Sequence, residues 1–268
     1  HQFKGNPTPV GGGVRAQNLW GKIKRYSEKK EKNNGPWPFD AMPNFQRALR
    51  PNQKWRDVMK SCIGSESTKY IGVHLRVEPD MLEHPCSKRM DMETNVTKIF
   101  NDIDNFLTKS SYYDKNAMEA ISIATNRKAL EAHIPYKSAY KNVIKENLKT
   151  LNKFTKSGTM QHNIGGKGMS VFECGKPHLD KYFANHPDEK KYDYGVLLHM
   201  VLNFEMLVES DIFIGVYGSS FSQDVWYSRY YRGKGSTNFE YTKEGIVHVG
   251  DEGMPRPFSC WRRNRMLH

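Results

Sequence analysis

Three short runs of apolar residues constrain the fold of this chain more than any other feature of its sequence. They are "YIGVHL" at 70–75, "EAISIAT" at 119–125 and "DIFIG" at 211–215. Each has the length of a strand and few polar residues, as expected for strands that are buried on both faces. The segments between them carry apolar residues at helical spacing. The sequence therefore predicts an α/β fold, a Rossmann-like parallel sheet with helices on both faces.

Apolar periodicity sets the helices that we expect around these strands. Within 92–110, for example, Val96, Ile99 and Ile103 fall on one helical face. A glycine-rich loop is expected at 165–169, followed by a strand at 170–174. The expected helices are 52–64, 92–110, 126–134, 141–154, 193–210 and 219–232.

This regular pattern begins only at about residue 46. Residues 1–45 are rich in glycine, proline, lysine and asparagine, which is typical of turns and loops. We therefore expect a loop-rich N-terminal segment at 1–45, either the remnant of a first domain or the connection to one. Residues 46–268 would form the Rossmann-like domain. Because the chain begins with histidine and not methionine, we expect that it has been trimmed.

The chain carries a net charge of +12, which favours anionic partners such as nucleic acid, membrane surfaces or phosphorylated small molecules. The lysines are widely spread, however, and solvated surface faces explain them equally simply. No nucleic-acid-binding module is recognised, so we do not expect nucleic acid as a partner. No apolar run approaches ~18 residues, so no membrane span is expected in this chain.

The cysteines and one sequon bear on the compartment without deciding it. The four cysteines form no Cys-x-x-Cys pair, which argues against a zinc site and leaves disulfides and buried thiols both open. Asn95-Val96-Thr97 is an N-glycosylation sequon, although a single sequon arises easily by chance. The ER or Golgi lumen is expected for a secretory enzyme whose anchor was removed, and the cytoplasm otherwise. The cysteines are Cys62, Cys86, Cys174 and Cys260.

A cluster of charged residues follows the first buried strand. His74 and Arg76 are two residues apart, so an extended chain places them on the same side. The planar guanidinium of Arg76 suits a pyrophosphate. Pro79 ends the strand and should hold Asp80 in a fixed turn close to Glu78. The simpler alternative is a salt-bridge cluster between Arg76 and these carboxylates that seals the edge of the sheet.

A turn of glycines and serines follows the later strand at 211–215. Gly215 and Gly218 allow the backbone to approach a ligand closely, and Ser219 and Ser220 begin the next helix. The free N–H groups and the positive end of that helix would bind an anion, with the serine hydroxyls as further donors. The alternative is an ordinary serine N-cap after a glycine turn.

Both clusters follow strands of the same predicted sheet. In such sheets, ligands bind beyond the carboxyl ends of the strands. Arg76 on one side and a helix N-terminus on the other therefore favour a nucleoside diphosphate more than either cluster does alone.

The same residues resemble a known family. "YIGVHLRVEPDML", followed by Cys86, resembles the signature of the protein O-fucosyltransferase superfamily, especially its plant-type branch. "FEMLVESDIFIGVYGSSFSQDV" resembles the later motif of that superfamily, and "RALRPNQKWRDVMKSCIG" resembles the helix before its His-Leu-Arg strand. The resemblance covers roughly residues 46–232, with the motifs in the family's order.

The resemblance implies an inverting GT-B glycosyltransferase that uses a nucleotide sugar without a metal or another cofactor. Residues 46–268 would then be the nucleotide-sugar-binding domain. Arg76 would bind the β-phosphate and stabilise the leaving diphosphate, which fits the need for preorganised donors where negative charge develops. His74 and Asp80 would shape the nucleotide site, and Asp211 would lie near the base or ribose.

The later motif supplies the rest of the donor site that the resemblance implies. Ser219, Ser220 and Phe221, next to Gly218, would hold the phosphates and the nucleoside. The base for an inverting transfer is a carboxylate near the acceptor hydroxyl. The available candidates, Glu78 and Asp80, join Arg76 as the expected catalytic residues.

The N-terminal region departs from the family. A complete GT-B enzyme has two Rossmann-like domains, and the family's first motif, a Gly-Gly turn, lies far ahead of the His-Leu-Arg strand. Its nearest match here, "GGGVRAQN" at 11–18, is too close to His74 for a full domain. The first domain is therefore either truncated or naturally reduced, which leaves the acceptor site undefined.

Three hypotheses of function remain. The first is a transferase that moves fucose from GDP-fucose to a glycan or glycoprotein hydroxyl, with UDP-xylose or a rhamnose nucleotide as open alternatives for the donor. The second, suggested by the reduced N-terminal region, is a non-catalytic binder of nucleotide sugars. The third is a nucleic-acid-binding protein, suggested by the +12 charge alone.

Overall fold

The chain divides into two compact units, His1–Phe45 and Gln46–His268. The structure, a computed structural model, describes residues 50–65, 67–83, 92–109, 118–132, 138–155, 161–164, 167–191, 195–250 and 252–255. These all belong to the second unit. The expectations for residues 1–45, including the Gly-Gly turn at 11–18, lie outside the described residues.

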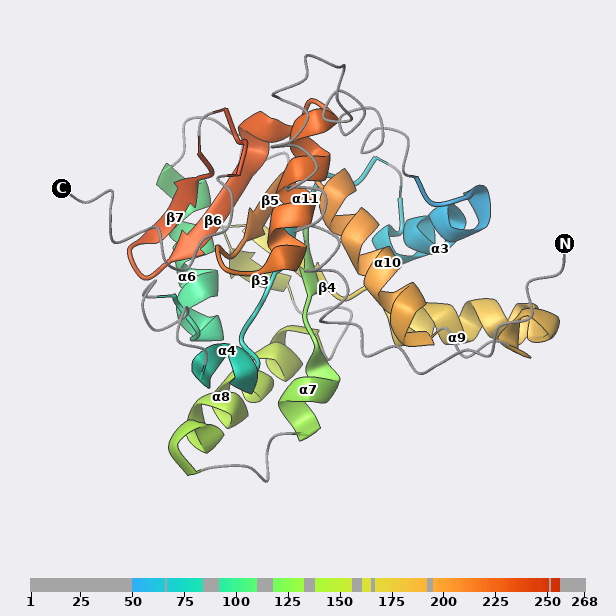
Figure 1. Ribbon diagram of the computed structural model, residues 1–268, viewed down its shortest axis with the longest axis horizontal. Coiled ribbons are helices and arrows are strands. Elements are labelled where there is room, and N and C mark those ends of the chain that lie inside the picture. The colour runs from blue at the N-terminus through green and yellow to red at the C-terminus, as the bar shows by residue number, and fades with distance from the viewer. Residues whose placement is uncertain are drawn as a thin grey trace, which may run out of the picture. The chain divides into compact units, whose positions relative to one another are not determined.

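The described strands form one seven-stranded sheet in the order β3-β4-β2-β1-β5-β6-β7 (Figure 1). Strands β4, β2, β1, β5 and β6 are parallel to one another. Strands β3 and β7 pair antiparallel at the two edges. The predicted α/β fold with a mostly parallel sheet is therefore confirmed. The strands are β1 Tyr70–His74, β2 Ala120–Ala124, β3 Gln161–Ile164, β4 Lys167–Phe172, β5 Ile212–Gly215, β6 Asn238–Thr242 and β7 Gly245–His248.

The order of the parallel strands reverses next to β1. The chain places β2 and then β4 on one side of β1, and β5 and then β6 on the other. This is a doubly wound arrangement, and its reversal falls between β1 and β5. The carboxyl ends of β1 and β5 therefore flank the crevice in which such sheets bind ligands.

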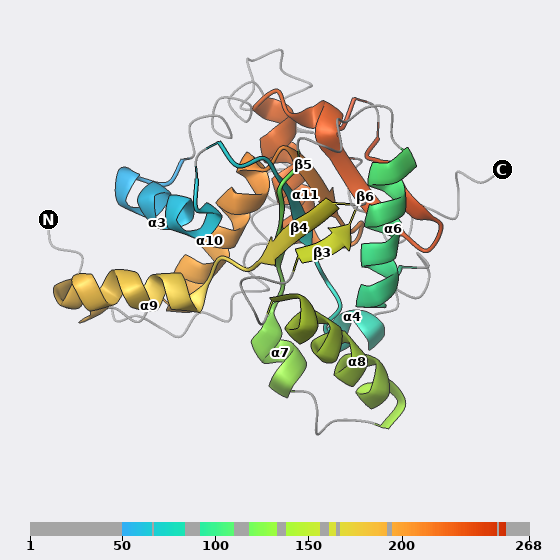
Figure 2. The same ribbon diagram turned by 180° about the vertical axis from the view of Figure 1, so that it is seen from behind.

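Helices cover both faces of the sheet. On one face, Ile71, Ile121 and Ile212 belong to a core that includes residues of α6 and α8. On the other face, Phe213 packs with residues of α10 and α11. Figure 1 shows α10 and α11 in front of the central strands, and Figure 2 shows α6 and α8 from behind. The helices are α3 Gln53–Ile63, α4 Pro79–Glu83, α6 Val96–Lys109, α7 Arg127–Ala132, α8 Ser138–Thr155, α9 Lys176–Asn185, α10 Gly195–Glu209 and α11 Ser220–Tyr231, with 3₁₀ turns at Pro187–Lys191 and Gly235–Thr237.

Helix α10 approaches the sheet closely because β1 has a glycine at the contact. A Cβ atom at Gly72 would lie 2.8 Å from Ser210 Oγ and 3.0 Å from a methyl group of Leu207. At the C-terminal end of α10, the fully buried Arg229 of α11 donates to the carbonyls of Val208 at 2.9 Å and Ser210 at 2.5 Å. A cation at a helix C-terminus is favourable, so Arg229 fixes α11 against α10.

Most of the predicted elements are present, with two corrections. Pro79 does not end the strand and Asp80 does not lie in a turn, because β1 ends at His74 and Pro79 begins helix α4, Pro79–Glu83. The loop expected at 165–169 is wrong over its second half, because Lys167–Phe172 is strand β4, which pairs with β3. Residues 165 and 166 lie outside the described residues. Strands β3, β6 and β7 and helices α4 and α9 were not predicted, since they are short and carry many polar residues.

A disulfide joins Cys62 of α3 to Cys174, just beyond β4, with 5.3 Å between the two Cα atoms. Of the two alternatives left open by the sequence, disulfides or buried thiols, Cys62 and Cys174 therefore form a disulfide. Cys86 and Cys260 lie outside the described residues. Among the described helices, none combines the length and the apolar character that crossing a membrane would require.

Candidate functional site at the carboxyl ends of β1 and β5

The residues that follow β1 and β5 lie together at the reversal of strand order. Strand β1 ends at His74, and β5 ends at Gly215, which the turn to α11 follows. The neighbouring strands pair Val73 with Ile214, so both ends reach the same edge of the sheet. The two motifs that the sequence singles out are therefore brought together, although they are far apart in the chain.

His74 is buried against the first turn of α11. Its Nδ1 lies 2.7 Å from Ser222 Oγ, and its ring centroid lies 4.8 Å from that of Phe221. Ser222 Oγ also accepts from the Val216 N–H at 3.1 Å. Burial, together with the nearby charge of Arg76, lowers the pKa of His74 to about 3. His74 is thus a neutral residue that fixes α11 to β1.

The turn into α11 has the geometry that its glycines predict. Gly218 has a φ of 98°, which a side chain would strain, and a Cβ at Gly215 would lie 2.9 Å from Ser222 Oγ. Ser219 is the N-cap, and its side chain accepts from the Ser222 N–H. Within the described part of the chain, the N–H groups of Ser220 and Phe221 have no hydrogen-bond acceptor. These two groups are available to an anion.

Arg76 lies between two carboxylates of very different exposure. Its NH1 group donates to Glu78 Oε2 at 2.7 Å, and its NH2 group donates to Asp80 Oδ2 at 2.5 Å. The Glu78 side chain is 2% exposed, whereas that of Asp80 is 60% exposed. Burial opposes the charge of Arg76, but the two carboxylates more than offset it and raise its pKa. The salt-bridge cluster that was the simpler alternative is therefore present.

Glu78 is held from both sides. Besides Arg76, its carboxylate accepts from the backbone N–H of Asn126, which follows β2, at 3.1 Å. The Arg76 N–H in turn donates to the hydroxyl of Tyr241 in β6 at 3.1 Å. These contacts fix the segment after β1 to its neighbours on each side. Glu78 therefore positions Arg76, and its contacts leave little freedom for a role as a base.

Arg76 retains donors that could reach a ligand. A guanidinium has five N–H groups, and the bonds to Glu78 and Asp80 use both of those on NH1 and one on NH2. No described residue accepts from Nε or from the second N–H of NH2. An anion that displaced the exposed Asp80 would gain further donors, at the cost of an ion pair worth about 0–1 kcal/mol.

The structure does not bring Asp211 to this edge. Asp211 precedes β5, and its carboxylate accepts from the N–H of Tyr70, the first residue of β1, at 2.9 Å. It therefore lies at the amino end of the sheet, away from the ends of β1 and β5 where His74, Arg76, Ser219, Ser220 and Phe221 lie. Its contacts point to a role in aligning the two strands.

Two residues of this region were not singled out from the sequence. Ser222 fixes His74, and its only signal was its place in the Ser-Ser-Phe-Ser run. Asp224 lies one helical turn after Ser220 and reaches solvent, yet partial desolvation raises its pKa. Among the described residues, no hydrogen bond or ion pair engages the Asp224 carboxylate. A carboxylate of this kind is a candidate base.

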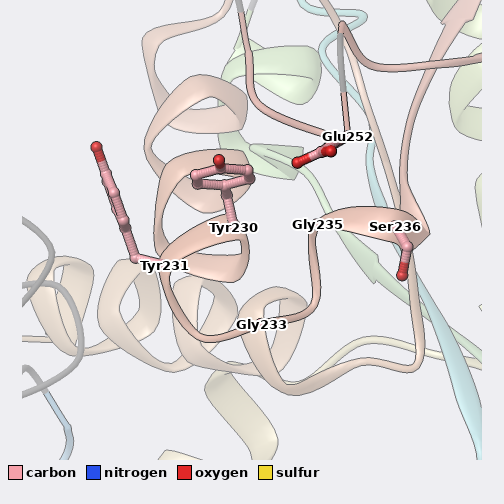
Figure 3. Close-up of a pocket in the computed structure, with 6 residues that line it drawn as sticks. All are labelled: Tyr230, Tyr231, Gly233, Gly235, Ser236 and Glu252. Atoms are coloured by element: carbon pink, nitrogen blue, oxygen red, sulfur yellow. The ribbon is translucent and has the colours of Figure 1, made fainter.

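A separate hollow of about 380 Å³ lies at the C-terminal end of α11 (Figure 3). Helix α11 begins at the carboxyl edge of the sheet and runs away from it, so this hollow is at the far end of the helix from Ser220. Figure 3 shows the Glu252 carboxylate extending toward the Tyr230 ring. The hollow is not part of the site between β1 and β5. Its lining residues are Tyr230, Tyr231, Gly233, Gly235, Ser236 and Glu252.

Comparisons of the chain with protein-family models, with curated proteins and with solved structures give no match.

Proposed function

We propose that the chain is an inverting, metal-independent glycosyltransferase whose donor diphosphate binds between the ends of β1 and β5. The single observation that carries the proposal is that Arg76, just after β1, and the N-terminus of α11, just after β5, lie at the same edge of the sheet where the strand order reverses. Arg76 and the N–H groups of Ser220 and Phe221 are donors of the kind that hold a diphosphate. The ring of Phe221, whose centroid lies 4.8 Å from that of His74, would contact the nucleoside.

The two carboxylates allow Arg76 to exchange one ion pair for a bound phosphate while the other ion pair stays in place. Buried Glu78 keeps the guanidinium in place, and exposed Asp80 occupies the position that a phosphate would take. The donor phosphate exchanges with Asp80, whereas the contact with Glu78 persists. This exchange adds no reorganisation of the buried part of the site.

In the reaction, the acceptor hydroxyl oxygen forms a bond to the anomeric carbon of the sugar. The bond from that carbon to the diphosphate oxygen breaks, and the diphosphate leaves with the electron pair. Arg76 and the helix N-terminus stabilise the charge that develops there. The base that takes the hydroxyl proton is one of the exposed carboxylates, Asp80 after its release from Arg76, or Asp224.

Fucose from GDP-fucose is the donor that the motif resemblance to protein O-fucosyltransferases supports, with UDP-xylose and rhamnose nucleotides as alternatives. The acceptor is a glycan or a glycoprotein hydroxyl. A non-catalytic binder of nucleotide sugars is the second candidate, and it shares every donor contact. It differs in lacking turnover.

Release of nucleoside diphosphate from a panel of nucleotide sugars, measured in EDTA, tests the proposal. We expect slow donor hydrolysis by the wild type, because transfer to water replaces transfer to the missing acceptor. The Arg76→Ala variant should lose at least about tenfold in rate, since charged hydrogen bonds contribute about 1.5–3 kcal/mol.

Two outcomes would contradict this account. Turnover that requires added Mn²⁺ would assign the charge stabilisation to a metal. Donor binding without release of diphosphate from any member of the panel would favour the non-catalytic binder.

A further inference from the structure

A modification site lies at the start of α6. Asn95-Val96-Thr97 forms an N-glycosylation sequon, which marks surface segments of secreted proteins. Asn95 directly precedes α6 and is exposed, as is Thr97, whereas Val96 is fully buried in the core. We propose that Asn95 carries an N-linked glycan. This inference is independent of the glycosyl transfer proposed above.

The contacts of Asn95 leave the reacting nitrogen accessible. Its Oδ1 accepts from the Lys98 N–H at 3.1 Å and caps the helix. Within the described part of the chain, Nδ2 has no hydrogen-bond partner. The amide is therefore oriented with its oxygen toward the helix and its nitrogen toward solvent.

Glycosylation at this nitrogen is compatible with the cap. The donor is a lipid-linked oligosaccharide diphosphate, the substrate class of N-glycosylation. A bond forms between Asn95 Nδ2 and the anomeric carbon, the bond from that carbon to the diphosphate oxygen breaks, and the diphosphate leaves with the electron pair. One amide proton passes to a base of the transferring enzyme. The product is still an amide, so Oδ1 continues to accept from Lys98.

The disulfide is a second observation that supports the modification. Cys62 and Cys174 are separated by 112 residues, and their bond joins α3 to the segment after β4. Disulfides persist in oxidising compartments, which in eukaryotes are reached through the pathway that carries out N-glycosylation. The sequon alone could arise by chance, but in a eukaryotic cell a chain that folds with this disulfide passes through a compartment where the sequon is used.

The glycan would extend from the corner where α6 meets α8 and the β6–β7 turn. Thr97 Oγ1 lies 3.1 Å from Thr150 Oγ1 in α8, and Lys98 Nζ donates to the Lys243 carbonyl at 3.0 Å. These contacts hold the polypeptide around Asn95 in a fixed position. The attached sugar would therefore cover this corner without displacing the core under Val96.

The test uses the full chain produced through the secretory pathway of a eukaryotic cell. Peptide mass spectrometry after peptide N-glycosidase F should find aspartate at position 95, because the enzyme converts a glycosylated asparagine to aspartate. Intact protein should shift to higher mobility after the same treatment. Asn6, whose sequon contains a proline, should remain asparagine.

Three variants separate the modification from folding. Asn95→Asp keeps an oxygen for the Lys98 N–H but lacks the acceptor nitrogen, so it should fold and lose the mobility shift. Thr97→Val should also lose the shift, and Thr97→Ser should keep it. A secreted chain that contains the Cys62–Cys174 bond with unmodified Asn95 would overturn the proposal. A shift that persists in Asn95→Asp would overturn it as well.

Discussion

At the scale of single residues, the burial of each ionisable group separates its role from that of its neighbours. Glu78 and Asp80 both contact Arg76, but only Asp80 is exposed enough to exchange with a ligand. His74 is buried and Asp224 reaches solvent, although both lie at or near α11. Side-chain chemistry alone placed His74, Glu78 and Asp80 in one cluster. Their contacts show that His74 and Glu78 hold neighbouring groups in place, whereas Asp80 can exchange with a ligand.

The buried His74 predicts a specific dependence of stability on pH. Its pKa falls from 6.5 in the unfolded chain to about 3 in the folded one. Below pH 6.5 the unfolded state therefore binds a proton that the folded state does not, and stability is lost as pH falls toward 3. A difference of one bound proton changes the free energy of unfolding by about 1.4 kcal/mol per pH unit.

Urea unfolding at about pH 7, 6, 5 and 4 measures this effect in the wild type and in His74→Asn. The asparagine retains an acceptor near Ser222 but does not titrate, so the free energy of unfolding of the variant should fall less steeply with pH. The other titrating groups are the same in both proteins, so their contributions cancel when the free energy of unfolding of the variant is subtracted from that of the wild type. Parallel pH profiles for the two proteins would show that His74 is not buried in its neutral form.

At the scale of elements, the strands whose bounds were predicted most closely are those buried on both faces, whereas β4 was expected at 170–174 and spans Lys167–Phe172. Strands β1, β2 and β5 are fully buried, so apolar content alone marks them. Strand β7 carries exposed residues, and its pairing with β6 depends on a hairpin rather than on apolar content. The strand order was not predictable, because it depends on which helices cross which face of the sheet.

The disulfide is an element-scale feature with a measurable contribution. It ties α3 to the end of β4 across 112 residues of sequence, so it restricts the unfolded chain strongly. The double variant Cys62→Ser/Cys174→Ser should lose about 2–4 kcal/mol in the free energy of unfolding by urea. Reduction of the wild type should lower its stability toward that of the variant. Equal midpoints for oxidised wild type and variant would show that this bond does not form.

At the scale of the whole molecule, the sequence predicted which two motifs would lie together better than it predicted the contacts between them. Strand ends in a parallel sheet predicted that the segments after β1 and β5 would share an edge, and they do. The pairing of His74 with Ser222 across 148 residues could not be predicted, since it requires knowing that β1 and β5 are neighbours. The position of Asp211 was predictable in principle, because a residue that precedes a parallel strand lies at the opposite edge from one that follows it.

The central claim is that a nucleoside diphosphate binds at the ends of β1 and β5 through Arg76, and calorimetric titration tests it most directly. GDP and UDP would be titrated, in EDTA, into the wild type, Arg76→Gln, Asp80→Asn and, as a control in the distant hollow, Glu252→Gln. At least one nucleotide should bind the wild type and Glu252→Gln equally. Arg76→Gln should weaken binding at least about tenfold, and Asp80→Asn should tighten it by up to about fivefold, because a competing ion pair is removed. Binding that is unchanged in Arg76→Gln, or no binding of either nucleotide to the wild type, would contradict the account.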